Sequence, residues 1–360
     1  GVAFYLLIKT RALLVAALPE GSDRINLAQL LDLVALGTVA DLVPLDENNR
    51  RLVQSGIKRI RAGRARPGIQ ALIEISGLDH RVLTTTQLAF NVAPRLNAAG
   101  RLEDMSLGVA CLLATPEAAQ ALAARLDELN RTRREIEQSM QAQAAELLLA
   151  VGRAPDSARF GISLFDSRWH EGVVGILASR VRAQCARPVF AFAEASNGLL
   201  KGSGRSIEGL QLRDLLAEMD AARQGLLQKF GGHAMAAGVT IRQEDFSEFA
   251  TLFDLHAKAH LSGRDLNERI VSEGLVPSFV LEMVAGLVRD HPWGQGFPEP
   301  IFDEGLEIVE QKVLKGGHLK LKLLSVRFPA ALEGIFFNQD RVIDRRNVRF
   351  AFKLDVNRYR

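Results

Sequence analysis

The fold is decided by the stretch TPEAAQALAARLDELNRTRREIEQSMQAQAAELLLA, residues 115–150. It begins with a threonine, which is a common N-cap, and continues with a proline at the first helical position and no glycine or proline after it. At 1.5 Å per residue, an unbroken helix over this stretch would be roughly 50 Å long. A helix of that length most simply connects two domains.

Residues 1–114 show the three- and four-residue spacing of apolar side chains that is typical of helices, as in INLAQLLDLVALGTVADL and NRRLVQSGIKRI. This pattern predicts a helical layer that forms one side of an α/β domain. The chain opens with GVAFYLLIKTRALLVAALPEG, in which Lys9 and Arg11 interrupt the apolar run. We therefore expect neither a membrane-spanning helix nor a signal peptide, but an ordinary core helix.

From Arg159 onward, short strand-like runs such as FGISLF, PVFAFAE and LLKGSGRS alternate with helical patterns, which predicts an α/β domain over residues 151–262. A helix around PSFVLEMVAGLVRDH follows, and then the strand-like runs LEIVEQKVLKGGHLKLKLLS, ALEGIFFN and VRFAFKLDVN. Short strands with glycine-bearing turns favour a small β-barrel over residues 263–360. The predicted fold class is thus α/β and multidomain.

The composition is that of an ordinary soluble globular protein, with 48% hydrophobic and 24% charged residues among 360. The two cysteines, Cys111 and Cys185, form no CxxC pair, and we expect free thiols in a reducing compartment such as the cytoplasm. The formal net charge is only +3, so an anionic partner must be met by local clusters of basic residues.

One such cluster is RRLVQSGIKRIRAGRAR, residues 50–66, which holds seven lysines or arginines and no acid. It forms either a solvated helix face with its following loop or a surface that faces nucleic acid or phosphate.

A single carboxylate, Asp41, lies within the apolar stretch LVALGTVADLVPL, residues 33–45. Carboxylates are rarely buried without a partner, because removing the charge from water costs several kcal/mol unless a cation or hydrogen-bond donors compensate. The sequence therefore predicts that Asp41 faces a cation or a set of donors.

Three further motifs combine polar side chains with glycine and alanine. In APRLNAAGRL, residues 93–102, we expect a loop that lets a phosphate approach two guanidinium groups, or simply a capped loop between two helices. In RWHEGVVGILASR, residues 168–180, a strand-to-helix transition favours an anion, unless the acid there merely caps the helix. The pair GSGRS, residues 202–206, and GGHAMAAG, residues 231–238, resembles an anion-binding nest.

Taken in order, ALGTVADLVPL, RLNAAGR, HEGVVGILASR, GSGRS and GGHAMAAG resemble the RecJ branch of the DHH phosphoesterase family, the bacterial single-stranded-DNA-specific 5′-to-3′ exonucleases. PWGQGFPEP, HLKLKL and LDVNRYR resemble the oligonucleotide-binding (OB) domain that follows in those proteins. The resemblance covers the whole chain. It departs from the family in one respect, because the Asp-x-Asp and Asp-His-His motifs do not occur in these residues.

The resemblance implies four parts. Residues 1–114 would be the C-terminal, helical part of a DHH catalytic domain, and residues 115–150 the connecting helix. Residues 151–262 would be the DHH-associated (DHHA1) domain, and residues 263–360 an incomplete, OB-like barrel that binds nucleic acid. The chain would then be a fragment, with further segments before Gly1 and after its last residue.

By the same resemblance, Asp41 would be one of several Asp and His ligands of two divalent cations, Mn²⁺ or Mg²⁺. The complete two-metal site is expected only in the full-length protein. The side chains that line the catalytic cleft beside the metals would be Arg95, Asn97 and Arg101. Asp41 is expected at the edge of an open concavity that also displays Arg95 or Arg101.

In the DHHA1 domain, the resemblance assigns the terminal 5′ phosphate to Ser203, Arg205 and Ser206. The terminal nucleotides would lie on Gly231, Gly232 and His233, with His170 and Glu171 beside the same strand. Phe336 and Phe337 of the barrel would stack on bases further along.

The expected function is 5′-to-3′ exonucleolytic hydrolysis of single-stranded DNA in repair and recombination, in a cleft that excludes a duplex. These 360 residues alone are expected to bind DNA without cleaving it. By resemblance, the protein partners would include single-strand-binding protein and recombination helicases. No association with a membrane is expected.

Two alternatives stay open. One is a DHH phosphodiesterase for very short oligonucleotides or cyclic dinucleotides, against which residues 265–360 argue because such enzymes usually lack the barrel. The other is a catalytically silent protein that binds single strands or recruits partners.

Overall fold

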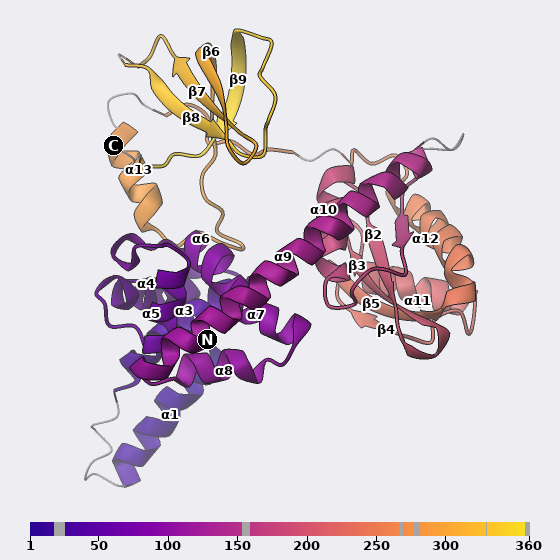
Figure 1. The fold of residues 1–360 in the computed structure, drawn as a ribbon, viewed down its shortest axis with the longest axis horizontal. Helices are drawn as coiled ribbons and strands as arrows, with labels where there is room; N and C mark the ends of the chain where they lie inside the picture. The colour runs from indigo at the N-terminus through magenta and orange to yellow at the C-terminus, as the bar shows by residue number, and fades with distance from the viewer. Residues whose placement is uncertain (18–25, 153–158, 267–268, 277–280, 329, 357–360) are drawn as a thin grey trace. The chain divides into compact units, whose positions relative to one another are not determined.

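The computed structural model describes residues 1–17, 26–152, 159–266, 269–276, 281–328 and 330–356 (Figure 1). The chain divides into two compact units, one formed by Gly1–Ala93 with Arg269–Arg360 and the other by Pro94–Glu268. No helix among the described residues is long and apolar enough to cross a membrane.

The first unit begins with a helical layer, as predicted from the spacing of apolar residues. Asp46 caps the helix that follows it, since its carboxylate accepts the N–H of Asn49 at 2.7 Å. The elements are α1 Val2–Ala17, the 3₁₀ turn η1 Leu27–Leu30, α3 Leu31–Ala40, α4 Glu47–Arg61, α5 Pro67–Ile75, the 3₁₀ turn η2 His80–Val82, α6 Thr85–Gln87, the π-helical turn η3 Leu88–Val92 and, after the second unit, α13 Leu281–Asp290.

Helix α1 is not the core helix that we expected. Phe4 is its one buried side chain, whereas Val2 and Leu6 are 87% and 66% exposed. The apolar side chains of α1 are spread around its whole circumference instead of forming one apolar face. The other described residues pack against one side of the helix, and of its side chains they bury only Phe4.

The C-terminal part of the first unit is a curled antiparallel sheet, a half-barrel, which confirms the predicted incomplete barrel. A β-bulge between Ile308 and Glu310 bends its longest strand, and Leu319, Leu321 and Leu323 alternate into its core. Residues 357–360 of the LDVNRYR segment lie outside the described residues. The strands, in the order β8-β7-β6-β9, are β6 Phe302–Leu314, β7 His318–Leu324, β8 Leu332–Phe336 and β9 Asn347–Phe352.

The second unit is organised along helix α9, Pro116–Gly152, which runs unbroken as predicted (Figure 1). Its first half packs against α8, Ser106–Leu113, and its second half packs against α10, Val174–Cys185. The unbroken helix is therefore confirmed, whereas its role as a connector between two domains stays a prediction, because α8, α9 and α10 all belong to the same unit.

The stretch APRLNAAGRL was expected to be a loop, and this expectation is wrong. It forms helix α7, Ala93–Leu102, directly after the π-helical turn η3. Alanine, leucine and arginine favour helix, and Pro94 lies at the start of α7, where the missing N–H costs little.

The remainder of the unit is a five-stranded sheet in the order β1-β2-β3-β5-β4. β1 pairs with β2 in parallel, and the other pairs are antiparallel. Its elements are β1 Ile162–Phe165, α10, β2 Val189–Glu194, the 3₁₀ turn η4 Ser196–Gly198, β3 Leu199–Arg205, α11 Leu212–Ala222, β4 Lys229–Gly232, β5 Ala236–Arg242, the 3₁₀ turn η5 Gln243–Asp245 and α12 Phe246–Leu261.

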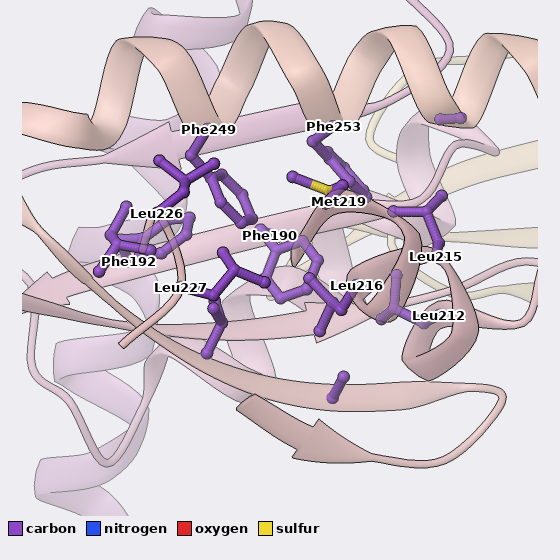
Figure 2. Packing of buried hydrophobic residues seen from close by; sticks show 14 of the residues in the cluster. Phe190, Phe192, Leu212, Leu215, Leu216, Met219, Leu226, Leu227, Phe249 and Phe253 are labelled. Carbon is purple, nitrogen blue, oxygen red and sulfur yellow. The ribbon is translucent and has the colours of Figure 1, made fainter. Parts of the chain in front are cut away.

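The two faces of this sheet are covered differently. On one face, α11 and α12 enclose an aromatic cluster in which Phe190 lies edge-on to Phe249 and Phe253, at 5.3 and 5.0 Å between ring centroids (Figure 2). On the other face, α9 and α10 pack with Trp169 against β1 and β2. Both Cys111 and Cys185 are free thiols, as predicted, and burial raises the pKa of each.

Two helical glycines in the first unit offer a matched test of the α3–α4 contact. A Cβ on Gly56 would lie 2.2 Å from the carbonyl oxygen of Leu31 and 2.5 Å from Cβ of Ala35, whereas a Cβ on Gly37 would meet nothing within 4 Å. We expect Gly56→Ala to destabilise the unit by about 1–3 kcal/mol despite the better helix propensity of alanine. Gly37→Ala should instead stabilise it by roughly 0.5–1 kcal/mol.

Urea denaturation, followed by hydrogen exchange of the α3 and α4 amides, measures both changes. Equal effects of the two substitutions would contradict the close approach of α4 to α3.

Candidate phosphate-binding site

Ser203 and Arg205 form the floor of a polar site on strand β3. Nη1 of Arg205 donates to Oγ of Ser203 at 3.0 Å and to the carbonyl of Gly204 at 2.8 Å. A Cβ placed on Gly175, at the start of α10, would lie 3.0 Å from both the Arg205 guanidinium and the Ser203 hydroxyl. The N-terminal end of α10, which carries positive partial charge, therefore closes directly against these two side chains.

Arg101, at the end of α7, is the second arginine of the site. Its Nη1 donates to the carbonyl of Gly172 at 3.0 Å, just before α10. A Cβ on Gly172 would come within 2.3 Å of the Arg101 carbonyl oxygen, so only glycine permits this approach of α7. Arg101 is thus held beside the same helix end as Ser203 and Arg205.

Burial and neighbouring positive charge disfavour the charged forms of both guanidinium groups. Burial, followed by the charge of Arg101, lowers the pKa of Arg205. Burial and the charge of Arg133 lower the pKa of Arg101, and the carboxylate of Glu137 offsets part of this. Among the described residues, no carboxylate forms an ion pair with Arg101 or Arg205. Clustered cations that lack a directly paired carboxylate form a site for an anion.

The sequence did not predict that a buried carboxylate of α9 lies beside the arginines of this site. The buried carboxylate of Glu137 accepts Nη1 of Arg133 at 2.7 Å and Nε of Arg180 at 3.1 Å. The only signal was the four-residue spacing of Arg133 and Glu137 in RTRREIE, which also fits an exposed helix pair. That this pair is buried beside Arg101 depends on the packing of α9.

His170 and Glu171 lie just before α10, but neither caps it. Nδ1 of His170 accepts the N–H of Gly172 at 3.0 Å. The Glu171 carboxylate pairs with Nζ of Lys201 at 2.8 Å, and the N-cap residue, Val173, makes no side-chain hydrogen bond to the helix. The capping alternative for Glu171 is therefore wrong, because its carboxylate turns to the β3 lysine instead.

The GGHAMAAG motif forms the tight connection between β4 and β5. Gly232 has φ of 147°, and a Cβ there would lie 2.4 Å from the Ala236 carbonyl oxygen. The exposed His233 donates its N–H to that carbonyl at 2.8 Å, and its Nδ1 accepts the N–H of Met235 at 3.3 Å. In the sheet, Gly231 lies opposite Gly238, which lies opposite Ser203.

The other residues singled out by sequence are placed differently. The buried Ser206 donates its hydroxyl to the Leu210 carbonyl at 2.7 Å, so it is not brought to the site. The buried Arg95 pairs with Asp127 of α9 at 2.8 Å. Asn97 and Arg101 are four residues apart and share one face of α7. The structure therefore brings together Ser203, Arg205 and Arg101, and keeps Arg95 in a structural ion pair.

Asp41 is exposed, at the C-cap of α3, and Leu42 after it turns away with φ of 51°. The buried carboxylate of this apolar region is Asp32, which accepts the backbone N–H of Arg66 at 2.8 Å and pairs with its guanidinium at 3.3 Å. The cost of removing a carboxylate from water therefore falls on Asp32 and not on Asp41, which lies exposed. A concavity shared by Asp41 with Arg95 or Arg101 stays a prediction, since they belong to different units.

An exposed carboxylate such as Asp41 suits a hard divalent cation, but as one ligand of a set. In the part of the chain that the structure describes, no group of three or more His, Cys, Asp or Glu side chains could hold a metal ion. Asp41 therefore fits a metal site only if further ligands come from outside the residues that the structure describes.

The basic stretch 50–66 is largely engaged within the protein. The guanidinium of Arg50 lies 4.1 Å from the ring centroid of Phe297, and Arg51 pairs with Glu47. Arg61 donates to the Leu83 carbonyl and pairs with Asp290, and Arg66 holds Asp32. These contacts favour the alternative of a structural, partly solvated face.

Comparison with known proteins places these features in a family context. The DHHA1 domain family matches residues 158–259, and the RecJ OB domain family matches residues 277–360. The single-stranded-DNA-specific exonuclease RecJ of Escherichia coli (strain K12) is 47% identical over 370 aligned residues, which cover 100% of this chain and 64% of that protein. The chain thus spans less than two thirds of this relative.

Solved structures of RecJ proteins are also similar to this chain. The crystal structure of RecJ in complex with Mg²⁺ from Thermus thermophilus superposes with a TM-score of 0.75 and 31% identity, over 92% of this chain and 50% of that one. The Mn²⁺ complex of RecJ from the same organism gives a TM-score of 0.76 and 30% identity, over 92% of this chain and 47% of that one.

The geometry of the Arg101–Ser203–Arg205 site predicts that a small inorganic anion stabilises the second unit. Phosphate at ten times its dissociation constant should add roughly 1.4 kcal/mol by mass action, a rise of roughly 3–6 °C in the melting temperature. Arg101→Gln or Arg205→Gln should remove this rise, because each deletes one of the two charges.

Arg95→Met provides the contrast. It should lower the melting temperature without phosphate, because it breaks the buried pair with Asp127, yet leave the phosphate-induced rise unchanged. Differential scanning calorimetry measures both quantities. A phosphate effect that survives in both glutamine variants would place the anion elsewhere.

Proposed function

Because the chain belongs to the RecJ family of single-stranded-DNA-specific exonucleases, we propose that it holds the 5′-phosphorylated end of a single DNA strand at Arg101, Ser203 and Arg205. The observation that carries the proposal is the pair of guanidinium groups that share one helix N-terminus and have no carboxylate partner among the described residues. The proposed product is the nucleotide released from that end.

The chemistry of the site selects a terminal phosphate over an internal one. A terminal phosphate carries close to two negative charges at pH 7, whereas a phosphodiester carries one. Two arginines, a hydroxyl and a helix N-terminus stabilise the dianion with charge-assisted hydrogen bonds that a 5′ hydroxyl cannot make. This preference would fix the strand with its 5′ end inward and so set the direction of digestion.

The half-barrel supports binding of the strand further along. Phe336 and Phe337, at the end of β8, are 48% and 64% exposed. Exposed aromatic rings stack on bases with little regard to sequence, which suits an exonuclease. The presence of this sheet also disfavours the alternative of a phosphodiesterase for very short oligonucleotides.

Hydrolysis is proposed to use divalent cations, Mn²⁺ or Mg²⁺, with Asp41 as one oxygen ligand. Such ions activate water and stabilise the charge that develops on the phosphodiester. Arg101 and Arg205 would hold the terminal phosphate, and Asn97, on the same exposed face of α7 as Arg101, would border the strand. A role in DNA repair and recombination, partnership with single-strand-binding protein and helicases, and a cytoplasmic location are proposed from the resemblance alone.

The site of the 5′ phosphate is tested by Arg205→Ala. We expect a selective loss on the order of 1.5–3 kcal/mol in the binding free energy of a 5′-phosphorylated strand, and a small loss for a strand with a 5′ hydroxyl. Fluorescence anisotropy on both strands measures the difference. Arg213→Ala, an exposed arginine of α11, is the matched control. Equal losses for both strands would remove Arg205 from the 5′-phosphate pocket.

A second prediction separates binding from cutting. These 360 residues should bind single-stranded DNA, with an affinity that falls steeply with salt, but should not digest it with Mn²⁺ present. The reason is that Asp41 is the one metal ligand that the resemblance assigns among them. A cleavage time course on a 5′-labelled strand provides the measurement, and digestion by the purified chain would refute the argument.

A further inference from the structure

Half of one sheet face in the second unit has no described helix over it. α10 packs against β2 and β3, whereas α11 packs against β4 and β5 from the face that carries the aromatic cluster. The alternation of side chains shows which residues lie on the open side, because Gly202 and Gly204 face the aromatic core and Ala237, Val239 and Ile241 belong to it. The open-side residues are Lys201, Ser203 and Arg205 of β3, Ala236, Gly238 and Thr240 of β5, and Lys229 and Gly231 of β4.

These residues form parallel rows across the strands. In one row Ser203, Gly238 and Gly231 lie side by side, and in the next row Lys201, Thr240 and Lys229 do so. Rows two residues apart are separated by roughly 6.8 Å, and neighbouring strands by roughly 4.8 Å. The two lysines therefore flank Thr240 one row beyond the phosphate site.

The glycines of the first row are not explained by packing. A Cβ on Gly231 would meet nothing within 4 Å, and a Cβ on Gly238 would come no closer than 3.9 Å to any atom considered. Glycine within a strand weakens it, and its usual reason is the close approach of another backbone or a ligand. Here it leaves a flat strip of exposed backbone between the phosphate site and the two lysines.

The charge of the second row is positive. Lys201 pairs with Glu171, whereas Lys229 is exposed and forms no ion pair with any described carboxylate. The Thr240 side chain lies between them on the middle strand. Two ammonium groups, one hydroxyl and a single acid suit a singly charged anion better than a dianion.

We propose that Lys201, Thr240 and Lys229 form a second anion subsite, which takes an internal phosphodiester of the strand whose 5′ phosphate lies at Arg205. The glycine strip accommodates the nucleotide between the two phosphates. This subsite rests on the proposed function, because it requires a single strand that begins at Arg101, Ser203 and Arg205. Glu171 competes with the phosphodiester for Lys201 and so limits the affinity.

The test uses Lys201→Gln, Lys229→Gln and the double variant, with Lys258→Gln on α12 as the matched control. The probe is a 5′-phosphorylated oligothymidylate. Each single variant should weaken binding roughly 3- to 10-fold at low salt and reduce the slope of log K against log salt by about 0.7, one phosphate contact. Preference for 5′ phosphate over 5′ hydroxyl should not change, and Glu171→Gln should tighten binding.

A neutral methylphosphonate, placed in turn at each of the first linkages, locates the contact. At one position it should weaken binding to the unmodified protein and cause no further loss in the Lys201→Gln, Lys229→Gln double variant, since both partner charges are already gone there. If no linkage behaves in this way, or if the double variant binds as tightly as the unmodified protein, the subsite is overturned.

A different result would refute the proposed function itself. It is refuted if Arg205→Ala weakens 5′-phosphorylated and 5′-hydroxyl strands equally, whatever the lysine variants show. Circular dichroism of each glutamine variant confirms that the sheet is folded, as expected for substitutions of exposed side chains.

Discussion

Two buried carboxylates on helix α9, Asp127 and Glu137, link this helix to α7 and α10 and fix where the arginines of the second unit lie. Asp127 binds Arg95 of α7, and Glu137 binds Arg133 of its own helix and Arg180 of α10. Burial raises the pKa of Asp127, but hydrogen bonds from Arg131 and the charge of Arg95 outweigh this, and the net pKa is lowered. Its ionised form therefore stabilises the fold above the usual carboxyl pKa, and this stabilisation is lost as pH falls through the lowered pKa.

The same helix determines what the phosphate site can do. With the charges of Asp127 and Glu137 satisfied by other arginines, no described carboxylate pairs with Arg101 or Arg205. The site thus keeps an excess of positive charge in a partly buried place, which is costly without a ligand and favourable with one. Glycines at the points of closest approach, Gly172 and Gly175, let backbone and guanidinium groups meet there.

Sequence patterns predicted the larger elements well, because these depend on local rules. The α9 helix follows from a Thr-Pro start and the absence of breakers, and the half-barrel from short strands with glycine turns. They failed where local rules are ambiguous. APRLNAAGRL contains helix formers together with a proline and a glycine, so its composition fits a loop as well as the helix that it forms directly after the π-helical turn. Likewise, the apolar pattern around residues 25–42 does not tell which of its aspartates is buried, and packing selects Asp32.

By itself, the sequence determined the order of elements and the motifs that mark the family, since both are properties of neighbouring residues. It also pointed to Ser203 and Arg205, which are two residues apart on one strand and must share a face. Only the tertiary structure decided that Arg101 joins them while Arg95 and Ser206 do not. The physical reason is that a side chain's partner depends on which distant segment packs against it, and Arg101 meets the residues before α10 across 71 residues of chain.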